Sequence, residues 1–443
     1  MSIADTPTKH PVALALEEKI RSRTARAGVV GLGYVGLPLA VEFARAGFPV
    51  TGIDVSERKV GDLNRGVSYI QDVPSDVVAP LVAGGKLRAV TDYSAVRELD
   101  TINICVPTPL RKTKDPDMSY VVAACEQIVK HLHRGMLIIL ESTTYPGTTD
   151  ELLLPELEKS GLRVGEEFFL CFSPERVDPG NKNFQTHNIP KVVGGVTQSC
   201  TQMGALFYSQ ALKTVVPVSG TRVAEMVKLL ENTFRMINIG LVNEMANMCD
   251  RMGINVWEVI EAAATKPFGF MPFYPGPGLG GHCIPIDPFY LSWKTKEAGI
   301  EARFIELAGQ INGHMPHFVV DKVQKALNDC GKPVRDSRIH ILGVAYKRDI
   351  DDVRESPALD IMLMLKRLGG RISYTDPYVP SLHVDGIDLE SAPLESSLED
   401  ADCTVIVTDH ANLDYEMVVK TARLIVDTRN ALKKWPAPHV VRL

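Results

Sequence analysis

Three glycines, Gly31, Gly33 and Gly36, have the spacing of a turn that binds a pyrophosphate. They follow a short apolar stretch and precede a stretch with helical periodicity at residues 37–46. The first glycine permits a tight turn, the second lets the pyrophosphate approach the backbone, and the third allows the helix to pack closely on the strand. Amide groups at the start of that helix favour an anion. The spacing predicts a dinucleotide site; the alternative is a glycine-rich turn that serves packing alone.

Asp54 follows the second strand that we expect, at residues 49–53, and completes a βαβ unit. It lies about 20 residues beyond the glycines, where a carboxylate hydrogen-bonds the adenosine ribose of a dinucleotide. Because a carboxylate repels a 2′-phosphate, the site is predicted to bind NAD in preference to NADP.

Cys283 lies in a loop dense in proline and glycine, at residues 266–290, where glycine neighbours leave the thiol open to approach. Asp287 follows in the same loop and could position a base or a water molecule. The other cysteines occur in ordinary helix or strand contexts, where a cysteine is usually buried in the core. We therefore expect Cys283 to be a nucleophile, with a packed loop cysteine as the alternative.

A dinucleotide site and a nucleophilic cysteine together suggest a four-electron oxidation. An alcohol is oxidised to an aldehyde, the thiolate adds to form a thiohemiacetal, a second hydride loss gives a thioester, and water releases the acid. Lys228 and Asn232 share one face of a long predicted helix and could stabilise the alkoxide that develops. The alternative for Lys228 is a solvated surface lysine.

The elements that position these residues alternate between strand and helix. Further apolar strands are expected at residues 101–106, 136–140 and 168–172, a long helix at 221–252, and renewed alternation after residue 333. Such alternation forms parallel, doubly wound sheets. The predicted fold class is therefore α/β, with two Rossmann-like doubly wound parallel-sheet domains joined by a long central helix.

Three polar segments follow strands, at the sheet edge where α/β ligand sites lie. Residues 141–147 and 173–176 follow two strands of the first domain, and the charged segment 347–357 follows the first strand of the second domain. Each is either part of a site or a solvated turn.

Composition narrows the class of protein. The chain has 443 residues, 45% of them apolar and 23% charged, and a net charge of −6. These values exclude wholesale disorder and argue against a nucleic-acid partner, which requires a basic face. No apolar run is long enough for a membrane span, and no secretory signal opens the chain. The eight cysteines form no CxxC pair, so we expect reduced thiols, no metal and a cytoplasmic location.

At this point the residues resemble a known family, the UDP-glucose/GDP-mannose dehydrogenase superfamily of nucleotide-sugar 6-dehydrogenases. The segments that carry the resemblance are GLGYVGLPLA, CVPTP, ESTTYPGTT, SPER, EMVKLLENTFR, GGHCIPIDP and GVAYKRDIDDVRESP. The resemblance implies an N-terminal extension at 1–26, an NAD-binding Rossmann domain at 27–217, a central helical dimerisation domain at 218–330 that carries the cysteine loop, and a UDP-sugar-binding domain at 331–443. It also implies a homodimer or a higher homo-oligomer.

The resemblance further implies roles for individual residues. The implied catalytic residues are Cys283 as nucleophile, Lys228, Asn232, Asp287, Glu175 and Thr143. The implied NAD contacts are Gly31, Gly33, Tyr34, Val35, Gly36, Asp54, Lys59, Thr108, Thr143 and Arg354. The implied substrate contacts are Glu175, Arg176, Lys228, Asn232, Phe273, Tyr274, Pro275, Gly276, Gly280 and Lys347.

Departures from the UDP-glucose branch bear on the substrate. Residues 176–180 read Arg-Val-Asp-Pro-Gly where that branch has FLREG, and Pro267 and Ile286 replace an arginine and a lysine. Loss of the arginine removes a donor aimed at the sugar. The chain instead resembles the UDP-N-acetylhexosamine branch, most closely the UDP-N-acetyl-D-glucosamine 6-dehydrogenases of surface polysaccharide and lipopolysaccharide synthesis.

Alternatives within this branch are the UDP-N-acetylmannosamine and UDP-N-acetylgalactosamine enzymes, and UDP-glucose stays a further possibility. Outside it, the alternatives are a two-electron hydroxyacid dehydrogenase, which needs no cysteine nucleophile, and a dinucleotide-binding protein without catalysis.

Overall fold

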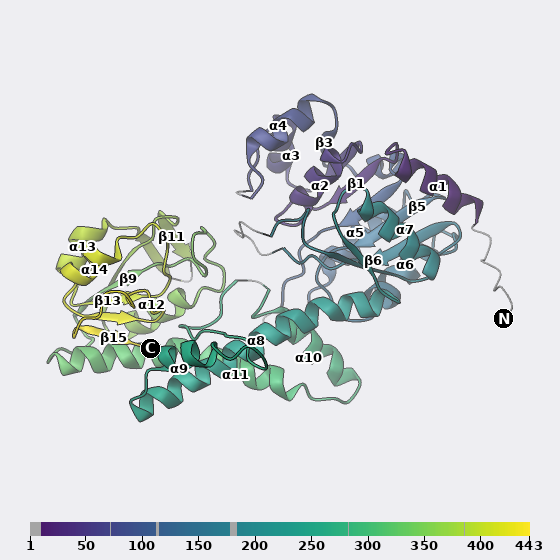
Figure 1. Cartoon of the computed structure of the whole chain (residues 1–443). Helices are drawn as coiled ribbons and strands as arrows, with labels where there is room; N and C mark the ends of the chain where they lie inside the picture. The colour runs from purple at the N-terminus through teal and green to yellow at the C-terminus, as the bar shows by residue number, and fades with distance from the viewer. Residues whose placement is uncertain (1–9, 71, 112–114, 178–183, 282, 385) are drawn as a thin grey trace. The chain divides into compact units, whose positions relative to one another are not determined.

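The structure, a computed structural model, describes residues 10–70, 72–111, 115–177, 184–281, 283–384 and 386–443. His282 of the cysteine loop and residues 178–180 lie outside the described residues. The chain divides into two units, Met1–Glu231 and Asn232–Leu443, and each is described by itself (Figure 1). Helix α8 (Thr221–Met252) begins in the first unit and ends in the second.

The first unit is built on one sheet with the strand order β3-β2-β1-β4-β5-β6-β7-β8. The strands from β3 to β6 in this order are parallel; β7 is antiparallel to β6, and β8 is parallel to β7. The strands are β1 (Ala27–Val30), β2 (Val50–Ile53), β3 (Leu87–Val90), β4 (Thr101–Ile104), β5 (Met136–Leu140), β6 (Phe168–Phe172), β7 (Lys191–Gly195) and β8 (Val215–Pro217). The helices and helical turns of this unit are α1 (Pro11–Arg21), α2 (Gly36–Arg45), α3 (Glu57–Asn64), α4 (Ser75–Ala83), η1 (Tyr93–Glu98), α5 (Ser119–Val129), η2 (Thr149–Leu153), α6 (Leu154–Glu158) and α7 (Gln198–Ser209).

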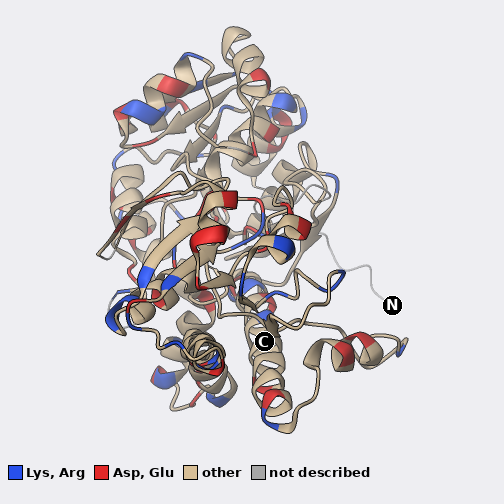
Figure 2. Cartoon of the chain, turned by 90° about the vertical axis from the view of Figure 1, so that its left-hand side faces the viewer, with Lys and Arg blue, Asp and Glu red and all other residues tan. Residues whose placement is uncertain are grey.

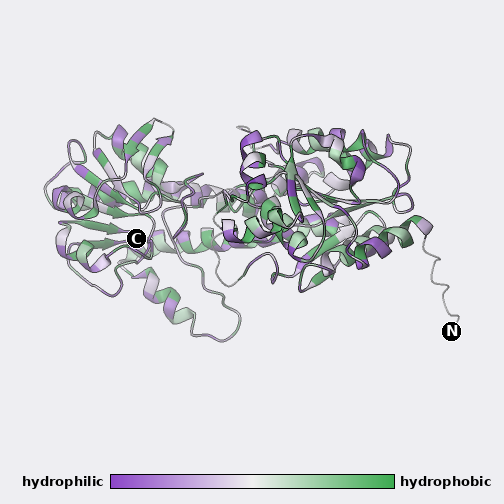
Figure 3. Ribbon diagram, turned by 90° about the horizontal axis from the view of Figure 1, so that it is seen from above, coloured by the Kyte–Doolittle hydropathy of each residue, from purple (hydrophilic) through white to green (hydrophobic). Residues whose placement is uncertain are grey.

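The core of this unit lies between the sheet and its helices. Strands β1, β2, β4, β5 and β6 are buried along their whole length, and most of their residues are apolar. Figure 3 shows green, hydrophobic stretches along the strands of both units. Phe43 of α2 stacks on Phe207 of α7, with ring centroids 4.3 Å apart. Leu16 and Ile20 of α1 are buried in the same core, so the N-terminal helix is part of this unit's packing.

The second unit contains a parallel sheet with the strand order β10-β9-β13-β14-β15 and a separate antiparallel hairpin. The strands of the sheet are β9 (Arg338–Leu342), β10 (Arg371–Thr375), β13 (Cys403–Ile406), β14 (Ile425–Asp427) and β15 (Val440–Arg442); β11 (Ser381–Val384) and β12 (Ile387–Glu390) pair with each other. The helices after α8 are α9 (Val256–Ala263), α10 (Asp287–Glu297), α11 (Arg303–Asp329), α12 (Pro357–Arg367), α13 (Leu394–Asp400) and α14 (Tyr415–Thr421).

This architecture confirms the predicted α/β class, with two Rossmann-like sheets and a long helix at Thr221–Met252. The antiparallel pairing of β6 with β7 and the hairpin β11–β12 were not predicted. Strand β4 ends at Ile104, two residues before the predicted end, because the chain there turns into the loop that packs against the glycine turn.

The strand orders place a ligand crevice in each sheet. The order reverses between β1 and β4 in the first sheet and between β9 and β13 in the second. In open α/β sheets, ligands bind at the carboxyl ends of the strands beside such a reversal. Figure 2 shows both basic (blue) and acidic (red) positions along the helices. Among the residues described, no helix combines the length and the apolar character that a membrane crossing requires.

Candidate functional site

The glycine turn has the geometry of a phosphate cradle. Gly31 has a φ of +87°, and a Cβ there would lie 2.6 Å from the Cys105 carbonyl oxygen. A Cβ at Gly36 would lie 1.8 Å from the Gly31 carbonyl oxygen, so helix α2 can begin here only without a side chain. A Cβ at Gly33, in contrast, would meet nothing within 4 Å. Helix α2 has no side-chain cap, and an anion in the open space at Gly33 would lie at the N-terminus of this helix.

Asp54 stands at the carboxyl end of β2 and is nearly buried. Its Oδ2 accepts a hydrogen bond of 2.8 Å from the Leu32 amide, and its Oδ1 accepts one of 2.9 Å from the Ser56 amide. The Lys59 ammonium lies 3.4 Å from Oδ2. These contacts fix the carboxylate beside the glycine turn and leave it lone pairs for ribose hydroxyls. The residues present therefore fit a dinucleotide of the NAD type.

A buried charge cluster lies at the carboxyl ends of β5 and β6. The Lys191 ammonium donates to Glu141 Oε2 at 2.5 Å, to Glu175 Oε2 at 3.1 Å and to the Pro174 carbonyl oxygen at 3.2 Å. We refer to Glu141, Glu175 and Lys191 as the Lys191 cluster. All three side chains are at least nine-tenths buried. Three hydrogen bonds account for the three protons of the ammonium.

Each carboxylate of the cluster has further donors. Glu141 accepts from Asn103 Nδ2 at 2.9 Å and from the Tyr208 hydroxyl. Glu175 Oε1 accepts from the amides of Arg176 and Val177, both at 2.8 Å. The Lys191 cluster is thus hydrogen-bonded throughout, which is the condition for burying charge at tolerable cost.

The pKa values in the cluster move in opposite directions. Burial raises the pKa of Glu175, but Lys191, the Val177 amide and Lys228 outweigh burial and hold this pKa below its ordinary value. Burial and the neighbouring Glu175 carboxylate raise the pKa of Glu141 despite Lys191. Burial lowers the pKa of Lys191, but the two carboxylates raise it further, so the ammonium persists. Glu175 is therefore held in its anionic form, with a lower proton affinity than an ordinary glutamate.

Helix α8 supplies two neighbours of this cluster within the first unit. Lys228 is nearly buried and acts electrostatically on Glu175. Arg176 forms a two-point ion pair with Glu231, with nitrogen–oxygen distances of 2.6 and 3.2 Å, and donates to the Pro190 carbonyl oxygen at 2.7 Å. The guanidinium of Arg176 is thus engaged with protein groups, which gives it a structural role beside the predicted contact with substrate.

Thr143 and Thr108 lie in the loops after β5 and β4, at the same edge of the sheet, and both are half-buried. The loop after β5 is tied to α8, since Glu225 accepts from the Gly147 amide at 2.6 Å and the Thr149 amide at 2.9 Å. Tyr34 and Val35 lie in the turn before α2, where the Tyr34 side chain is exposed.

Cys283 lies in a tight turn that leads into α10 of the second unit. Its carbonyl oxygen accepts from the amides of Ile286 and Asp287, at 3.1 and 2.8 Å. Asp287 is the first residue of α10, where the helix dipole favours its negative charge, and its Oδ2 accepts from Asn232 Nδ2 at 2.6 Å. The structure thus brings Cys283, Asp287 and Asn232 together.

All eight cysteines fall in the described part of the chain, and none forms a disulfide. Six are buried, and burial raises the pKa of Cys125 to about 12. Cys283 is half-buried and Cys330 is exposed. The cysteine in the glycine loop is therefore more accessible than the six core cysteines. Within the described ranges, no cluster of histidine, cysteine and carboxylate side chains has the geometry of a metal site.

The loop before Cys283 is held by a buried amide network. The Gly276 amide donates to Asn243 Oδ1 at 2.9 Å, and Asn243 Nδ2 donates to Asn312 Oδ1 at 2.8 Å. Phe273 contacts Phe234 edge to face, at a centroid distance of 5.7 Å. Tyr274 stacks on Trp257, and Pro275 is buried beside it.

Arg429 is a cation that the sequence analysis missed. It follows β14, its Nε donates to the Val407 carbonyl oxygen at 2.8 Å, and a Cβ at Gly276 would lie 2.7 Å from its Nη1. The guanidinium therefore lies against the predicted substrate loop. The only signal in the sequence was an arginine just after a short apolar strand.

Gly280 packs on the segment after β9, which carries Lys347 and Arg354. A Cβ at Gly280 would lie 2.5 Å from Tyr346 Cβ, and the Gly281 amide donates to the Arg354 carbonyl oxygen at 3.0 Å. Arg354 also forms an ion pair with Asp352 at 2.6 Å. The cysteine loop and the segment after β9 are therefore in direct contact within the second unit.

The predicted residues fall in both units. The first unit holds the glycine turn, Asp54, Lys59, Glu175, Arg176 and Lys228, and the second holds Asn232, Cys283, Asp287 and the substrate loop. A mostly parallel sheet with a dinucleotide cradle, and a second parallel sheet whose carboxyl edge contacts a cysteine loop, are the features expected of a dinucleotide-dependent oxidoreductase.

Comparison with known proteins identifies the family. Three profiles of the UDP-glucose/GDP-mannose dehydrogenase family match the chain: the NAD binding domain at residues 25–212, the central domain at 222–314 and the UDP binding domain at 340–434. The chain belongs to the UDP-glucose/GDP-mannose dehydrogenase family. The first of these domains confirms that the chain has an NAD-binding domain.

Individual relatives extend the match over nearly the whole chain. A UDP-N-acetyl-D-mannosamine dehydrogenase of Pyrococcus horikoshii is 35% identical over 94% of this chain and 98% of its own length. A UDP-N-acetyl-D-glucosamine 6-dehydrogenase of Pseudomonas aeruginosa is 34% identical over 90% of this chain and 94% of its own. A solved structure of the UDP-D-ManNAc dehydrogenase from Pyrococcus horikoshii superposes with a TM-score of 0.86 at 35% identity, covering 94% of this chain and 98% of that one.

Proposed function

We propose that this protein oxidises the C6 hydroxyl of a UDP-N-acetylhexosamine to the carboxylate, in two steps that each consume one NAD. The observation that carries the proposal is the pairing of Asn232 with Asp287 directly beside the Cys283 turn. A dehydrogenase that stops at the first oxidation needs no cysteine nucleophile such as Cys283. When bound, NAD supplies the acceptor for each hydride.

The residues of the chain have the following proposed roles. Cys283, as thiolate, adds to the aldehyde carbon, and after the second oxidation the carbon is held as a thioester. Water attacks that carbon and breaks the carbon–sulfur bond, which restores the cysteine. Glu175, which its lowered pKa keeps ionised, accepts the proton of the water as that proton is released. Lys228 and Asn232 stabilise negative charge on the sugar oxygen.

Binding of the two ligands is assigned to the two sheets. Gly31, Gly33, Gly36 and Asp54 hold the pyrophosphate and adenosine ribose of NAD, with Lys59, Thr108 and Thr143 along the cofactor. The UDP part of the substrate is assigned to the carboxyl edge of the second sheet, with Lys347 and the missed Arg429 as cations. Arg354 remains a proposed contact to the NAD pyrophosphate.

We keep UDP-N-acetyl-D-glucosamine as the expected sugar, on the likeness of the loop around Cys283. UDP-N-acetyl-D-mannosamine is a second candidate, which the Pyrococcus horikoshii relative favours. The two epimers differ at C2, remote from the carbon that is oxidised.

A homodimer is proposed from the surface of α8. Apolar side chains recur at helical spacing along one exposed face of this helix: Val223, Met226, Leu230, Phe234, Leu241, Met248 and Met252. An apolar stripe of this length marks an interface, and a second copy of the chain is a self-complementary partner. Leu241→Glu should therefore give a monomer by light scattering, whereas an unchanged mass would place the interface elsewhere.

The test of the activity is the NADH formed per sugar consumed, with UDP-N-acetylglucosamine, its manno and galacto epimers and UDP-glucose offered in parallel. Two NADH per sugar support the four-electron reaction, and the fastest sugar identifies the epimer. One NADH or none with every sugar would point to a hydroxyacid dehydrogenase or a binding protein.

Cys283→Ser should abolish acid formation and leave NAD binding intact. Cys330→Ser is the matched control, because Cys330 is the exposed cysteine at the end of α11 and should be dispensable. Acid formation by Cys283→Ser at the parent's rate would disprove the covalent mechanism.

A further inference from the structure

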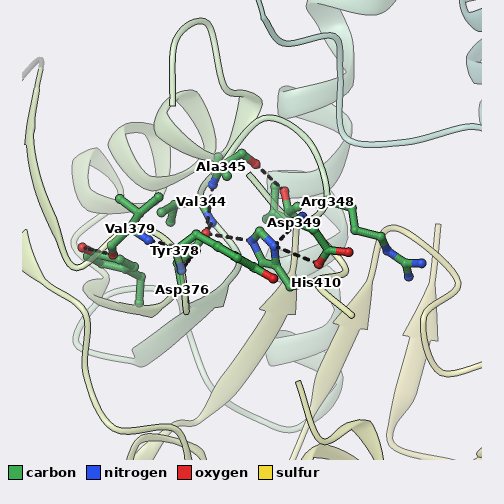
Figure 4. Close-up of polar contacts among 12 residues, drawn as sticks. Val344, Ala345, Arg348, Asp349, Asp376, Tyr378, Val379 and His410 are labelled. Atoms are coloured by element: carbon green, nitrogen blue, oxygen red, sulfur yellow. Dashed lines mark hydrogen bonds and ion pairs between the residues drawn. The ribbon is translucent and has the colours of Figure 1, made fainter. Parts of the chain in front are cut away.

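His410 is fully buried and uses both ring nitrogens at the carboxyl edge of the second sheet (Figure 4). It follows β13, and its Nε2 lies 2.9 Å from Asp376 Oδ2, just after β10. Its Nδ1 lies 3.0 Å from the Asp349 amide nitrogen, in the segment after β9. Since the amide can only donate, Nδ1 accepts, and Nε2 carries the proton donated to Asp376. One side chain thus joins the ends of three strands.

Asp376 is the anchor of this arrangement. Its Oδ2 also accepts from the amides of Val344 and Ala345, at 2.7 and 3.0 Å. Its Oδ1 accepts from the amides of Tyr378 and Val379, at 2.8 and 3.2 Å. A buried carboxylate that accepts five hydrogen bonds is fixed in position. Asp376 binds the amides of two residues just after β9, and His410, which donates to Asp376, binds the Asp349 amide further along the same segment.

The segment that His410 holds is strained and depends on such contacts. Asp349 has a φ of 62° and Glu355 one of 51°, a region that side chains seldom adopt without support. Asp349 Oδ1 accepts from the Ala411 amide at 2.7 Å, and Arg348 pairs with Asp409. The loops after β9 and β13 are therefore joined at several points, on either side of the position where the strand order reverses.

We propose that His410 is a positioning residue for the UDP part of the substrate, because its bond to the Asp349 amide fixes the segment 344–355 that carries Lys347. The inference rests on the proposed function, which places UDP at this edge. The segment in turn contacts the cysteine loop through Tyr346 and the Arg354 carbonyl group. Nothing in the proposed chemistry requires His410 to touch a ligand.

Two substitutions separate the two bonds of His410. In glutamine the terminal atoms lie two bonds from Cγ, as Nε2 does, so His410→Gln keeps a donor for Asp376 and loses the acceptor for Asp349. In asparagine the amide oxygen lies one bond from Cγ, as Nδ1 does, so His410→Asn keeps the acceptor for Asp349 and loses the donor. His383→Gln is the control, because His383 also pairs with an aspartate, through Nδ1 to Asp388, but on the exposed hairpin β11–β12.

The experiment is isothermal titration of the full-length protein with UDP and, separately, with NAD. We expect His410→Gln to weaken UDP binding about tenfold, the effect of one buried hydrogen bond, and to weaken NAD binding by no more than about threefold, because of this segment only Arg354 is assigned to NAD. His410→Asn should stay within about threefold of the parent, and His383→Gln should match it.

Parental UDP affinity in His410→Gln, or equal weakening by His410→Asn, would overturn the inference while the proposed function stands. Equal losses for UDP and NAD in a variant would indicate general unfolding and would also overturn it. Failure of the parent itself to bind UDP would disprove the proposed UDP site and the inference with it.

Discussion

Removal of the buried cation in the Lys191 cluster should be strongly destabilising. Lys191→Met keeps the length of the side chain but leaves Glu141 and Glu175 in a buried site without their shared ammonium. Breaking a buried ion pair by deletion of one partner costs about 3–5 kcal/mol, because the remaining charge is uncompensated. Two carboxylates lose one cation here, so we expect the upper half of that range, about 4–5 kcal/mol.

The assay is urea unfolding at pH 7, followed by circular dichroism, on the parent and on Lys191→Met. Lys159→Met is the matched control, because Lys159 pairs with Glu156 at 2.5 Å but is exposed. An exposed pair contributes about 0–1 kcal/mol, so the control should unfold almost with the parent.

A second variant tests the cause of the loss. In Lys191→Met with Glu141→Gln, one of the two carboxylates is neutral, and its amide oxygen still accepts from Asn103 and Tyr208. The repulsion between the carboxylates is gone, so we expect recovery of about 1–3 kcal/mol relative to Lys191→Met alone. If Lys191→Met unfolds within about 1 kcal/mol of the parent, the cluster does not hold its charges as described, and the reasoning is refuted.

The remaining predictions concern the glycine turn, the Asp54 carboxylate and the buried His340. Gly33→Ala should leave the melting temperature unchanged and weaken NAD binding, because the added methyl group enters the open space in which we expect the phosphate. Gly36→Ala should lower the melting temperature, because its methyl group would lie 1.8 Å from the Gly31 carbonyl oxygen. Equal melting temperatures in calorimetry would contradict this contrast. Asp54→Ala should weaken NAD binding, measured by titration, by about 1.5–3 kcal/mol, because charge-assisted hydrogen bonds are lost. An unchanged dissociation constant would disprove the proposed contact between Asp54 and the adenosine ribose. Burial lowers the pKa of His340 to about 4, below its value of about 6.5 in the unfolded chain. As the pH falls, the unfolded chain therefore binds the proton first, and the free energy of unfolding decreases between about pH 6.5 and pH 4. The loss should reach about 2 kcal/mol at pH 5 in urea unfolding, and His340→Leu should abolish that part of the pH dependence.

The parts of the site that the sequence could predict are local. The glycine turn and Asp54 follow from a fixed spacing within one βαβ unit, and Cys283 and Asp287 lie within one turn of each other. Strand and helix alternation likewise predicted both sheets, since buried parallel strands are mostly apolar. These features depend on neighbours in the chain, which periodicity and spacing describe well.

The parts that escaped prediction join residues distant in sequence. Lys191 pairs with Glu141 across 50 positions, and His410 pairs with Asp376 across 34. Spacing alone cannot choose such partners, because the choice depends on which strands lie side by side. A signal did exist: Glu141 directly follows a fully apolar strand, and Lys191 opens another. A charge next to a buried strand must find a partner at the same edge of the sheet.

Each group of side chains that we propose to react is held by polar partners of its own unit. Lys191 orients Glu175 in the first unit, while Asp287 orients Asn232 and Asn243 fixes the Gly276 backbone in the second. Ordering a flexible side chain on binding costs about 0.5–1.5 kcal/mol, so fixed groups preserve that free energy for catalysis. Buried charges and amides are therefore kept at these positions, although apolar residues would be cheaper to bury. Lys191, Asp287 and Asn243 each position a polar group of their own unit, and that group must be polar for the proposed chemistry.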